Sequence, residues 1–189
     1  MSETATSGTA TADPQSPASS VSASSSASVS SEPAVLPDVR FDFDELAPGF
    51  SRAMAHLDHA AVVELDKAGI PDGLRNLVKL RASQLNGCSY CVDTHARDAR
   101  DSGESFQRIA AVAVWEEAHF FTARQRAAFA LTDAVTRLAE THVPDEVVAA
   151  ALRVYSEAKV SALLALLVSI NAWNAVGVTA RCWRVTAED

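Results

Sequence analysis

Residues 77–95 read LVKLRASQLNGCSYCVDTH, and this stretch decides both the local fold and the chemistry of the chain. In its first half, apolar residues recur at the three- and four-residue steps of an amphipathic helix. The pair Asn86-Gly87 breaks that pattern. We therefore predict that one helix ends at this pair and that the next begins at Cys88.

The remainder of the chain shows the same periodicity and contains few helix breakers. It has seven Gly and seven Pro in 189 residues, and no strand-like alternation of useful length. Thr122, followed by Gln125 three residues later, matches the start of a capped helix. Helices are predicted over residues 48–69, 71–86, 88–102, 104–115, 122–141, 144–155 and 159–182. The fold class predicted from these segments is an all-α helical bundle.

The first 36 residues have a different composition from the rest. Between Met1 and Ala34 there are twelve Ser, seven Ala and four Thr, and no Leu, Ile, Phe, Lys or Arg. Such a segment cannot bury enough apolar area to offset the entropy lost on ordering. We therefore predict a disordered tail over residues 1–36 and one folded domain over residues 37–189. The tail has neither the basic start and apolar run of a secretion signal nor the Arg of a mitochondrial presequence, so a cytoplasmic location is expected.

The charge of the chain argues against two classes of partner. Sixteen Lys and Arg against 24 Asp and Glu give a formal net charge of −8. Nucleic acids and anionic membranes are held mainly by basic side chains, so neither is expected as a partner. Three Cys are also too few for a small domain held together by disulfides.

Residues 160–180 are long and apolar enough to raise the question of a membrane span. Polar residues interrupt the segment and no basic cluster flanks its start, so a buried core or interface helix is expected instead. The polar residues are Ser161, Ser169, Asn171, Asn174 and Thr179. The two Asn would then need buried partners, which a protein interface can supply. The segment also predicts a homo-oligomer, because its apolar residues exceed what one domain face covers. They are Leu163, Leu164, Leu166, Leu167, Ile170 and Trp173.

The chemistry of the chain is concentrated between Cys88 and His95. On a helix, Cys88, Cys91 and His95 share one face within roughly 60° of one another. Cys88 lies at the helix N-terminus, where free amides and the helix dipole stabilise a thiolate. His95, one turn beyond Cys91, can accept a proton or pair with a thiolate. Two Cys at this spacing in a cytoplasmic protein are more often catalytic than structural.

Two simpler interpretations of the Cys pair compete with this one. Buried, unreactive cysteines are common, but the histidine in register and the helix start at Asn86-Gly87 argue against coincidence. Zinc usually needs four ligands, and the segment provides three, all on one helix. Nothing in the spacing indicates that Cys182, His119 or His142 supplies the fourth, so no metal is expected.

The chain from about residue 48 to residue 181 resembles the alkylhydroperoxidase D-like branch of the carboxymuconolactone decarboxylase family. The strongest match is residues 77–95, with supporting matches at residues 115–118, 124–132 and 170–174. The resemblance implies an all-helical fold, homo-oligomers, and thiol-based reduction of hydroperoxides or of a partner peroxiredoxin's disulfide. In the family the second Cys, here Cys91, becomes the sulfenic acid, and the first, here Cys88, resolves it as a disulfide. The family His, here His95, belongs to the proton relay. The decarboxylase branch lacks the Cys pair.

Two positions depart from the pattern of that family. The relay normally includes a Glu twelve residues before the first Cys, and Asn76 occupies that position here. The founding members have a second His between the two Cys, and Tyr90 stands in its place. An amide cannot accept a proton near neutral pH as a carboxylate does, so Asn76 is expected only to orient His95 or a water. If the family relay applies, Asn76 faces the Cys88–His95 cluster from the preceding helix.

Two functions from different classes follow. The leading hypothesis is a thiol-dependent antioxidant enzyme with peroxiredoxin or alkylhydroperoxidase activity. In it a hydroperoxide oxidises Cys91, Cys88 closes the disulfide, and an external dithiol or thiol protein reduces the disulfide. No glycine motif for a flavin or nicotinamide is present, so no cofactor is expected. The alternative is a non-enzymatic redox sensor or assembly subunit on the same fold with an impaired relay, which Asn76 favours.

Overall fold

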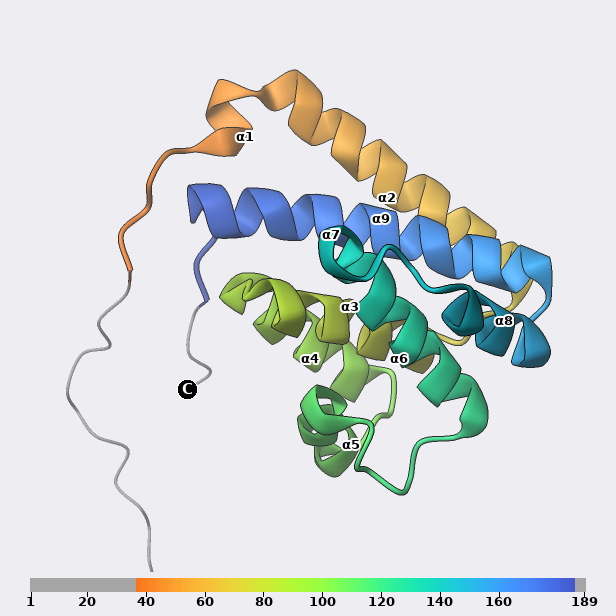
Figure 1. Cartoon of the computed structure of the whole chain (residues 1–189). Coiled ribbons are helices and arrows are strands. Elements are labelled where there is room, and N and C mark those ends of the chain that lie inside the picture. Colours follow the sequence, from red (N-terminus) through yellow and green to blue (C-terminus); the bar gives the residue numbers. More distant parts are fainter. Residues whose placement is uncertain (1–36, 186–189) are drawn as a thin grey trace, which may run out of the picture. The chain divides into compact units, whose positions relative to one another are not determined.

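The chain is described here by a computed structural model that covers residues 37–185 (Figure 1). Every regular element within that range is a helix, which confirms the all-α prediction. The elements are α1 (Phe43–Leu46), α2 (Pro48–Ala68), α3 (Asp72–Asn86), α4 (Ser89–Asp101), α5 (Phe106–Ala111), the 3₁₀ turn η1 (Val112–Val114), α6 (Ala123–Thr136), α7 (Leu138–Thr141), α8 (Asp145–Val154) and α9 (Glu157–Ala180). The tail predicted over residues 1–36 lies outside the described residues, as do the last four.

Helix α3 belongs to two hydrophobic clusters because two of its faces are apolar. Leu74 and Val78 are buried with residues of α2, α6 and α9. Leu77 and Leu80 are buried with residues of α4, η1 and α6. Helix α3 is therefore packed on two faces, and the Cys pair follows directly after its C-terminal end.

Helix α9 packs against α2 and α3 and runs beside α2 in Figure 1. By length and composition it is the one helix in the described range that could cross a membrane. Its residues Leu163, Leu166 and Leu167 are nevertheless buried against the helices of the first cluster. In this fold α9 therefore has the packing of a core helix.

The polar residues of α9 find partners inside the same chain. Nδ2 of Asn86 donates to Oδ1 of Asn171 at 2.7 Å and to Oδ1 of Asn174 at 2.9 Å. Nδ2 of Asn174 donates in turn to Oγ of Ser83 at 3.1 Å. The partners that the two Asn need are therefore supplied within the chain. These hydrogen bonds join the end of α3 to α9.

The segment predicted as one helix over residues 104–115 is shorter in the structure. Ser105 caps α5, which ends at Ala111 and continues only as the 3₁₀ turn η1. Beyond this point arginine side chains bind the backbone carbonyls: Arg81 binds that of Ala113, and Arg126 binds that of Trp115. A continuing α-helix would use these carbonyls internally.

The helix predicted over residues 122–141 is interrupted near its end. The capping box of Thr122 and Gln125 is present, as expected, but α6 ends at Thr136 and only the short α7 follows. Oγ1 of Thr141 donates to the carbonyl of Ala134 at 2.7 Å. Side-chain bonds of this kind compete with the helical hydrogen bonds.

One face of α9 remains apolar and uncovered. Four of the six residues that suggested an oligomer, Leu163, Leu166, Leu167 and Ile170, are buried within the protomer itself. Leu164, Val168 and Val178 are exposed, and their spacing places them along one stripe of the helix. Self-association through α9 would therefore use this exposed stripe and not the four buried residues.

We predict that the protein forms a homo-oligomer through the stripe of Leu164, Val168 and Val178. Val168→Lys places a charge in an apolar contact and should lower the mass measured by light scattering at micromolar concentration. Val114→Lys, at an exposed position of η1, serves as the control and should leave the mass unchanged. A monomer mass for the unmodified protein would contradict the prediction.

Candidate active site

The Cys pair lies at the sharp junction between α3 and α4. Gly87 ends α3 with a left-handed backbone (φ 71°), a conformation that glycine adopts without strain. Cys88 then caps α4, and its Sγ accepts a hydrogen bond from the backbone N–H of Cys91 at 3.4 Å. The two cysteines are joined as a disulfide, with their Cα atoms 5.3 Å apart. Cys182 is free.

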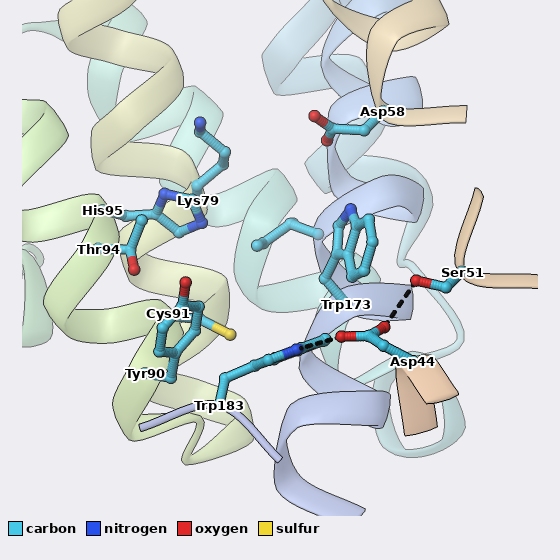
Figure 2. A pocket seen from close by; sticks show the side chains of 11 residues that line it. Asp44, Ser51, Asp58, Lys79, Tyr90, Cys91, Thr94, His95, Trp173 and Trp183 are labelled. Carbon is cyan, nitrogen blue, oxygen red and sulfur yellow. Dashed lines mark hydrogen bonds between the residues drawn. The ribbon is translucent and has the colours of Figure 1, made fainter. Parts of the chain in front are cut away.

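A cavity lies against one of the two cysteines. Cys88 and Cys91 are both buried, but Cys91 lines a cavity of about 340 Å³ and Cys88 does not (Figure 2). The other residues that line it are Asp44, Ser51, Asp58, Lys79, Tyr90, Thr94, His95, Ile170, Trp173 and Trp183. A molecule entering this cavity therefore meets the sulfur of Cys91.

Cys88 is enclosed by α9 and by the segment that follows α9. A Cβ atom on Gly177 would lie 2.9 Å from Sγ of Cys88 and 3.1 Å from the ring of Trp183. Such contacts are too short for any larger residue without a shift of its neighbours. The absence of a side chain at Gly177 thus allows α9 to approach the disulfide closely and to cover the Cys88 side of it.

An aromatic wall covers the cavity on the side of the C-terminal segment. The ring of Trp183 lies 5.6 Å from the rings of both Tyr90 and Trp173. Its Nε1 donates to Oδ2 of Asp44 at 2.8 Å, and Oγ of Ser51 donates to Oδ1 of the same carboxylate at 2.6 Å (Figure 2). The bonds from Ser51 and Trp183 lower the pKa of Asp44. Trp183 is thereby fixed to the N-terminal part of the domain.

His95 projects from α4 into the cavity as a neutral ring. Burial lowers the pKa of His95 to about 4, and the positive charge of Lys79 acts in the same direction, while Asp98 and Asp58 oppose the shift. Nδ1 of His95 lies 3.2 Å from Oδ2 of Asp98. Because the ring is neutral and Asp98 is an acceptor, Nδ1 carries the hydrogen and Nε2 is left with a lone pair.

Two charged side chains from other helices complete the cavity. Lys79 extends from α3, and no hydrogen bond or ion pair of its ammonium is found within residues 37–185. Asp58 extends from α2, and its Oδ1 accepts a hydrogen bond from Oγ of the buried Ser169 at 2.6 Å. Figure 2 shows Asp58 on the far side of the cavity from His95 and Lys79.

Asn76 does not line the cavity of Cys91. Its Nδ2 donates to the backbone carbonyl of Asp98 at 3.1 Å and lies 3.4 Å from Oγ of Ser102. The expectation that Asn76 faces the Cys88–His95 cluster is therefore wrong. Its contact with Asp98, whose carboxylate binds His95, agrees with the more modest expectation that it helps to orient the histidine.

Sequence reasoning found part of this site and missed the rest. The structure places Cys91 and His95 together on one cavity wall and leaves Cys88 behind Cys91, out of the cavity. Lys79 lay inside the diagnostic stretch but was not assigned a role. Asp44, Asp58 and Trp183 lie far from that stretch in sequence, and no local pattern marks them.

Within the described range, no group of three or more His, Cys, Asp or Glu is placed to hold a metal ion.

We predict that mild oxidation of the reduced protein joins Cys88 to Cys91 within one chain and leaves Cys182 free. The one-turn spacing brings the two thiols together, whereas Cys182 follows the end of α9. Peptide mapping by mass spectrometry tests this, with Cys182→Ser as the control that should give the same disulfide. Mainly Cys182-linked species would contradict it.

We also predict that His95 makes the fold sensitive to mild acid. Its pKa of about 4 in the folded chain lies below the value of 6.5 expected after unfolding, so the unfolded state binds a proton first as the pH falls. The contribution of neutral His95 to the free energy of unfolding is complete above pH 6.5. It declines by about 3 kcal/mol as the pH falls towards 4. Denaturant unfolding across that range should show a smaller decline for His95→Gln. The exposed His119, changed in the same way, is the control, and an unchanged profile for His95→Gln would refute the assignment.

The comparisons with known proteins agree with this arrangement. The model of the carboxymuconolactone decarboxylase family matches residues 48–134. An uncharacterised protein of Bacillus subtilis (strain 168), YdfG, is 32% identical over 139 residues, which are 74% of this chain and 92% of that protein.

Two solved structures resemble the fold. A protein of unknown function from Agrobacterium tumefaciens, provisionally described as the antioxidant defence protein AhpD, is 30% identical with a TM-score of 0.74. The match covers 79% of this chain and all of that one. The debrominase Bmp8 is 20% identical with a TM-score of 0.63 over 72% of each chain, which supports the fold alone. On the family match, the identity to these relatives and the shared fold, the chain belongs to the carboxymuconolactone decarboxylase family as an AhpD-like member.

Proposed function

We propose that this protein is a thiol-dependent antioxidant enzyme that reduces hydroperoxides, or the disulfide of a partner thiol protein, through Cys88 and Cys91. The observation that supports it most directly is the opening of the Cys91 sulfur into a cavity that also contains His95 and Lys79. A reactive thiolate needs access and favourable charge; the cavity gives access to Cys91, and the ammonium side chain of Lys79 lines the same cavity. The AhpD-like relative, provisionally placed in antioxidant defence, points in the same direction.

The geometry suggests different tasks for the two sulfurs. Cys91 meets the hydroperoxide: its thiolate attacks the peroxide oxygen and becomes a sulfenic acid. The thiol of Cys88 then attacks the sulfur of Cys91, and water leaves as the disulfide forms. Cys88 is suited to this second step because it adjoins Cys91 and is shielded from the cavity.

Reduction of the disulfide by an external dithiol or thiol protein uses the same difference between the two sulfurs. The incoming thiolate reaches the Cys91 sulfur through the cavity and expels the thiolate of Cys88, which leaves a mixed disulfide on Cys91. A second thiol of the donor then attacks the donor sulfur of that bond, so Cys91 is released as a thiolate and the donor leaves as a disulfide. The departing thiolate of Cys88 is stabilised by the N-terminus of α4 and by the N–H of Cys91 that its sulfur already accepts. A reducing cytoplasm, where such dithiols are maintained, is the compartment we propose.

A second candidate is a non-enzymatic redox sensor or assembly subunit. Two observations favour it: Asn76 provides no base, and the Trp183 ring adjoins Tyr90, the residue before Cys91. Opening the disulfide would then change the packing of the C-terminal segment rather than turn over a substrate. The two functions differ in whether peroxide is consumed repeatedly.

We predict dithiol-dependent peroxide consumption by the unmodified protein and its loss in Cys91→Ser. Cys88→Ser should form the sulfenic acid on Cys91 once and then turn over more slowly, because the resolving thiol is missing. Consumption of an alkyl hydroperoxide in excess dithiothreitol measures both. Cys182→Ser is the matched control and should keep the original rate. If the unmodified protein and Cys91→Ser consume peroxide equally, the sensor or assembly function takes precedence.

A further inference from the structure

The cavity of Cys91 has an aromatic end and a charged end. Figure 2 shows Cys91 with the rings of Tyr90 and Trp183 at its lower end, and Lys79 and Asp58 on opposite sides of its upper end. Lys79 and Asp58 also line a second cavity, of about 400 Å³, which the residues of the aromatic end do not line. The charged end therefore lies apart from the sulfur, on the side of the second cavity.

The two side chains of the charged end do not satisfy each other. No hydrogen bond or ion pair of the Lys79 ammonium is found among the described residues. Asp58 accepts one hydrogen bond, from Ser169 to its Oδ1, and none to its Oδ2 is found in the same part of the chain. In Asp44, by contrast, both carboxylate oxygens accept a bond. One ammonium and one carboxylate oxygen in this cavity are thus left to bind groups of opposite charge on a ligand.

The disulfide state of the site indicates what kind of reactant this cavity must admit. Cys88 and Cys91 are joined, and a disulfide reacts with a thiol, whereas a hydroperoxide needs reduced Cys91. Cys91 is only 4% exposed. The cavity of about 340 Å³ is near the small end of the range for ligand pockets, roughly 300–1,000 Å³. A thiol fixed on the surface of a folded protein does not fit such a space, but a small thiol does.

We propose that the Cys88–Cys91 disulfide is reduced by a low-molecular-weight thiol with an amino-acid end. The carboxylate of this thiol binds Lys79, its ammonium binds the free oxygen of Asp58, and its sulfur reaches Cys91. The proposal rests on the proposed function, because it names the electron donor of that site. The carboxylate and ammonium of such a ligand cancel in charge, so they meet both side chains without adding net charge to a half-buried space.

The proposed reduction balances in atoms and electrons, with two molecules of the small thiol in place of one dithiol. The first attacks the sulfur of Cys91 as a thiolate, the bond to Cys88 breaks, and a mixed disulfide remains on Cys91. The second attacks the small thiol's sulfur in that bond and expels the thiolate of Cys91. The two protons of the small thiols end on the two cysteines. The small thiols lose two electrons and leave as their own disulfide.

The test compares two small thiols on the full, oxidised protein near neutral pH, each in excess. L-Cysteine carries the amino-acid end, and 2-mercaptoethanol has the same two-carbon spacing from sulfur to a neutral hydroxyl. Samples are alkylated at intervals, and the reduced Cys88–Cys91 pair is counted by mass spectrometry. Both reagents attack as thiolates, so the ratio of the cysteine rate to the 2-mercaptoethanol rate removes any effect of cavity charge on the attack itself.

Two substitutions separate direct contact from long-range electrostatics. Lys79→Gln and Asp58→Asn should each lower the ratio about tenfold, because each removes one charge-assisted contact to cysteine. Long-range electrostatics alone leaves the ratio unchanged, since the amino-acid end of cysteine has no net charge. The double variant restores the net charge of the cavity, and its ratio should nevertheless stay as low as in the single variants.

Two further thiols assign each contact separately. The rate with 3-mercaptopropionate, which keeps only the carboxylate, should fall in Lys79→Gln but not in Asp58→Asn, relative to 2-mercaptoethanol. Cysteamine, which keeps only the ammonium, should give the reverse result. Lys79→Arg keeps the positive charge and should recover most of the ratio for cysteine. The matched controls are Lys67→Gln and Asp145→Asn, at exposed positions that line neither cavity, and they should keep the original ratios.

The outcomes distinguish this proposal from the proposed function. A ratio that is unchanged in either single variant, or that recovers in the double variant, would overturn the assignment of the donor. Peroxide consumption in dithiothreitol needs neither contact and tests the proposed function by itself. If that consumption persists while the ratio does not depend on Lys79 and Asp58, only the assignment of the donor is wrong. If the unmodified protein consumes no peroxide, the proposed function is wrong.

Discussion

The hydrogen bonds from Asn86 to Asn171 and Asn174 are the constraint on which the site depends. They join the last residue of α3 to the middle of α9, and Ser83 extends the network within the core. Buried amides are costly when unpaired, so the network permits few alternative registers between the two helices. It thereby holds the end of α3 against α9, next to the position where Cys88 caps α4 and Gly177 approaches the disulfide.

From this junction the site acquires its asymmetry. Cys88 lies against α9 and caps the N-terminus of α4, whereas Cys91, one turn later, lines the cavity. In the proposed thiol cycle the first position would stabilise a departing thiolate and the second would admit a reactant. The burial that protects the sulfurs also keeps His95 neutral.

Sequence periodicity predicted the helices well where their ends carry local signals. Gly69 and Gly87, both with left-handed backbones, end α2 and α3 where breakers indicated, and Thr122 begins α6 with its capping box. The errors fall where distant side chains intervene: Arg126 binds the carbonyls after η1, and Thr141 binds one in α6. No periodic pattern records a bond made by a residue many positions away.

The sequence by itself determined the all-α class and the placement of Cys88, Cys91 and His95 on one helix, because these follow from spacings within a few turns. The family came from the resemblance of residues 77–95 and of shorter stretches elsewhere in the chain. Only the tertiary structure decided which sulfur is accessible, where Asn76 points, and that Asp58 from α2 enters the cavity. Those outcomes depend on how α2, α4 and α9 pack against α3. Packing brings together residues more than a hundred positions apart, such as Asp58 and Ser169, and no local sequence rule encodes that contact.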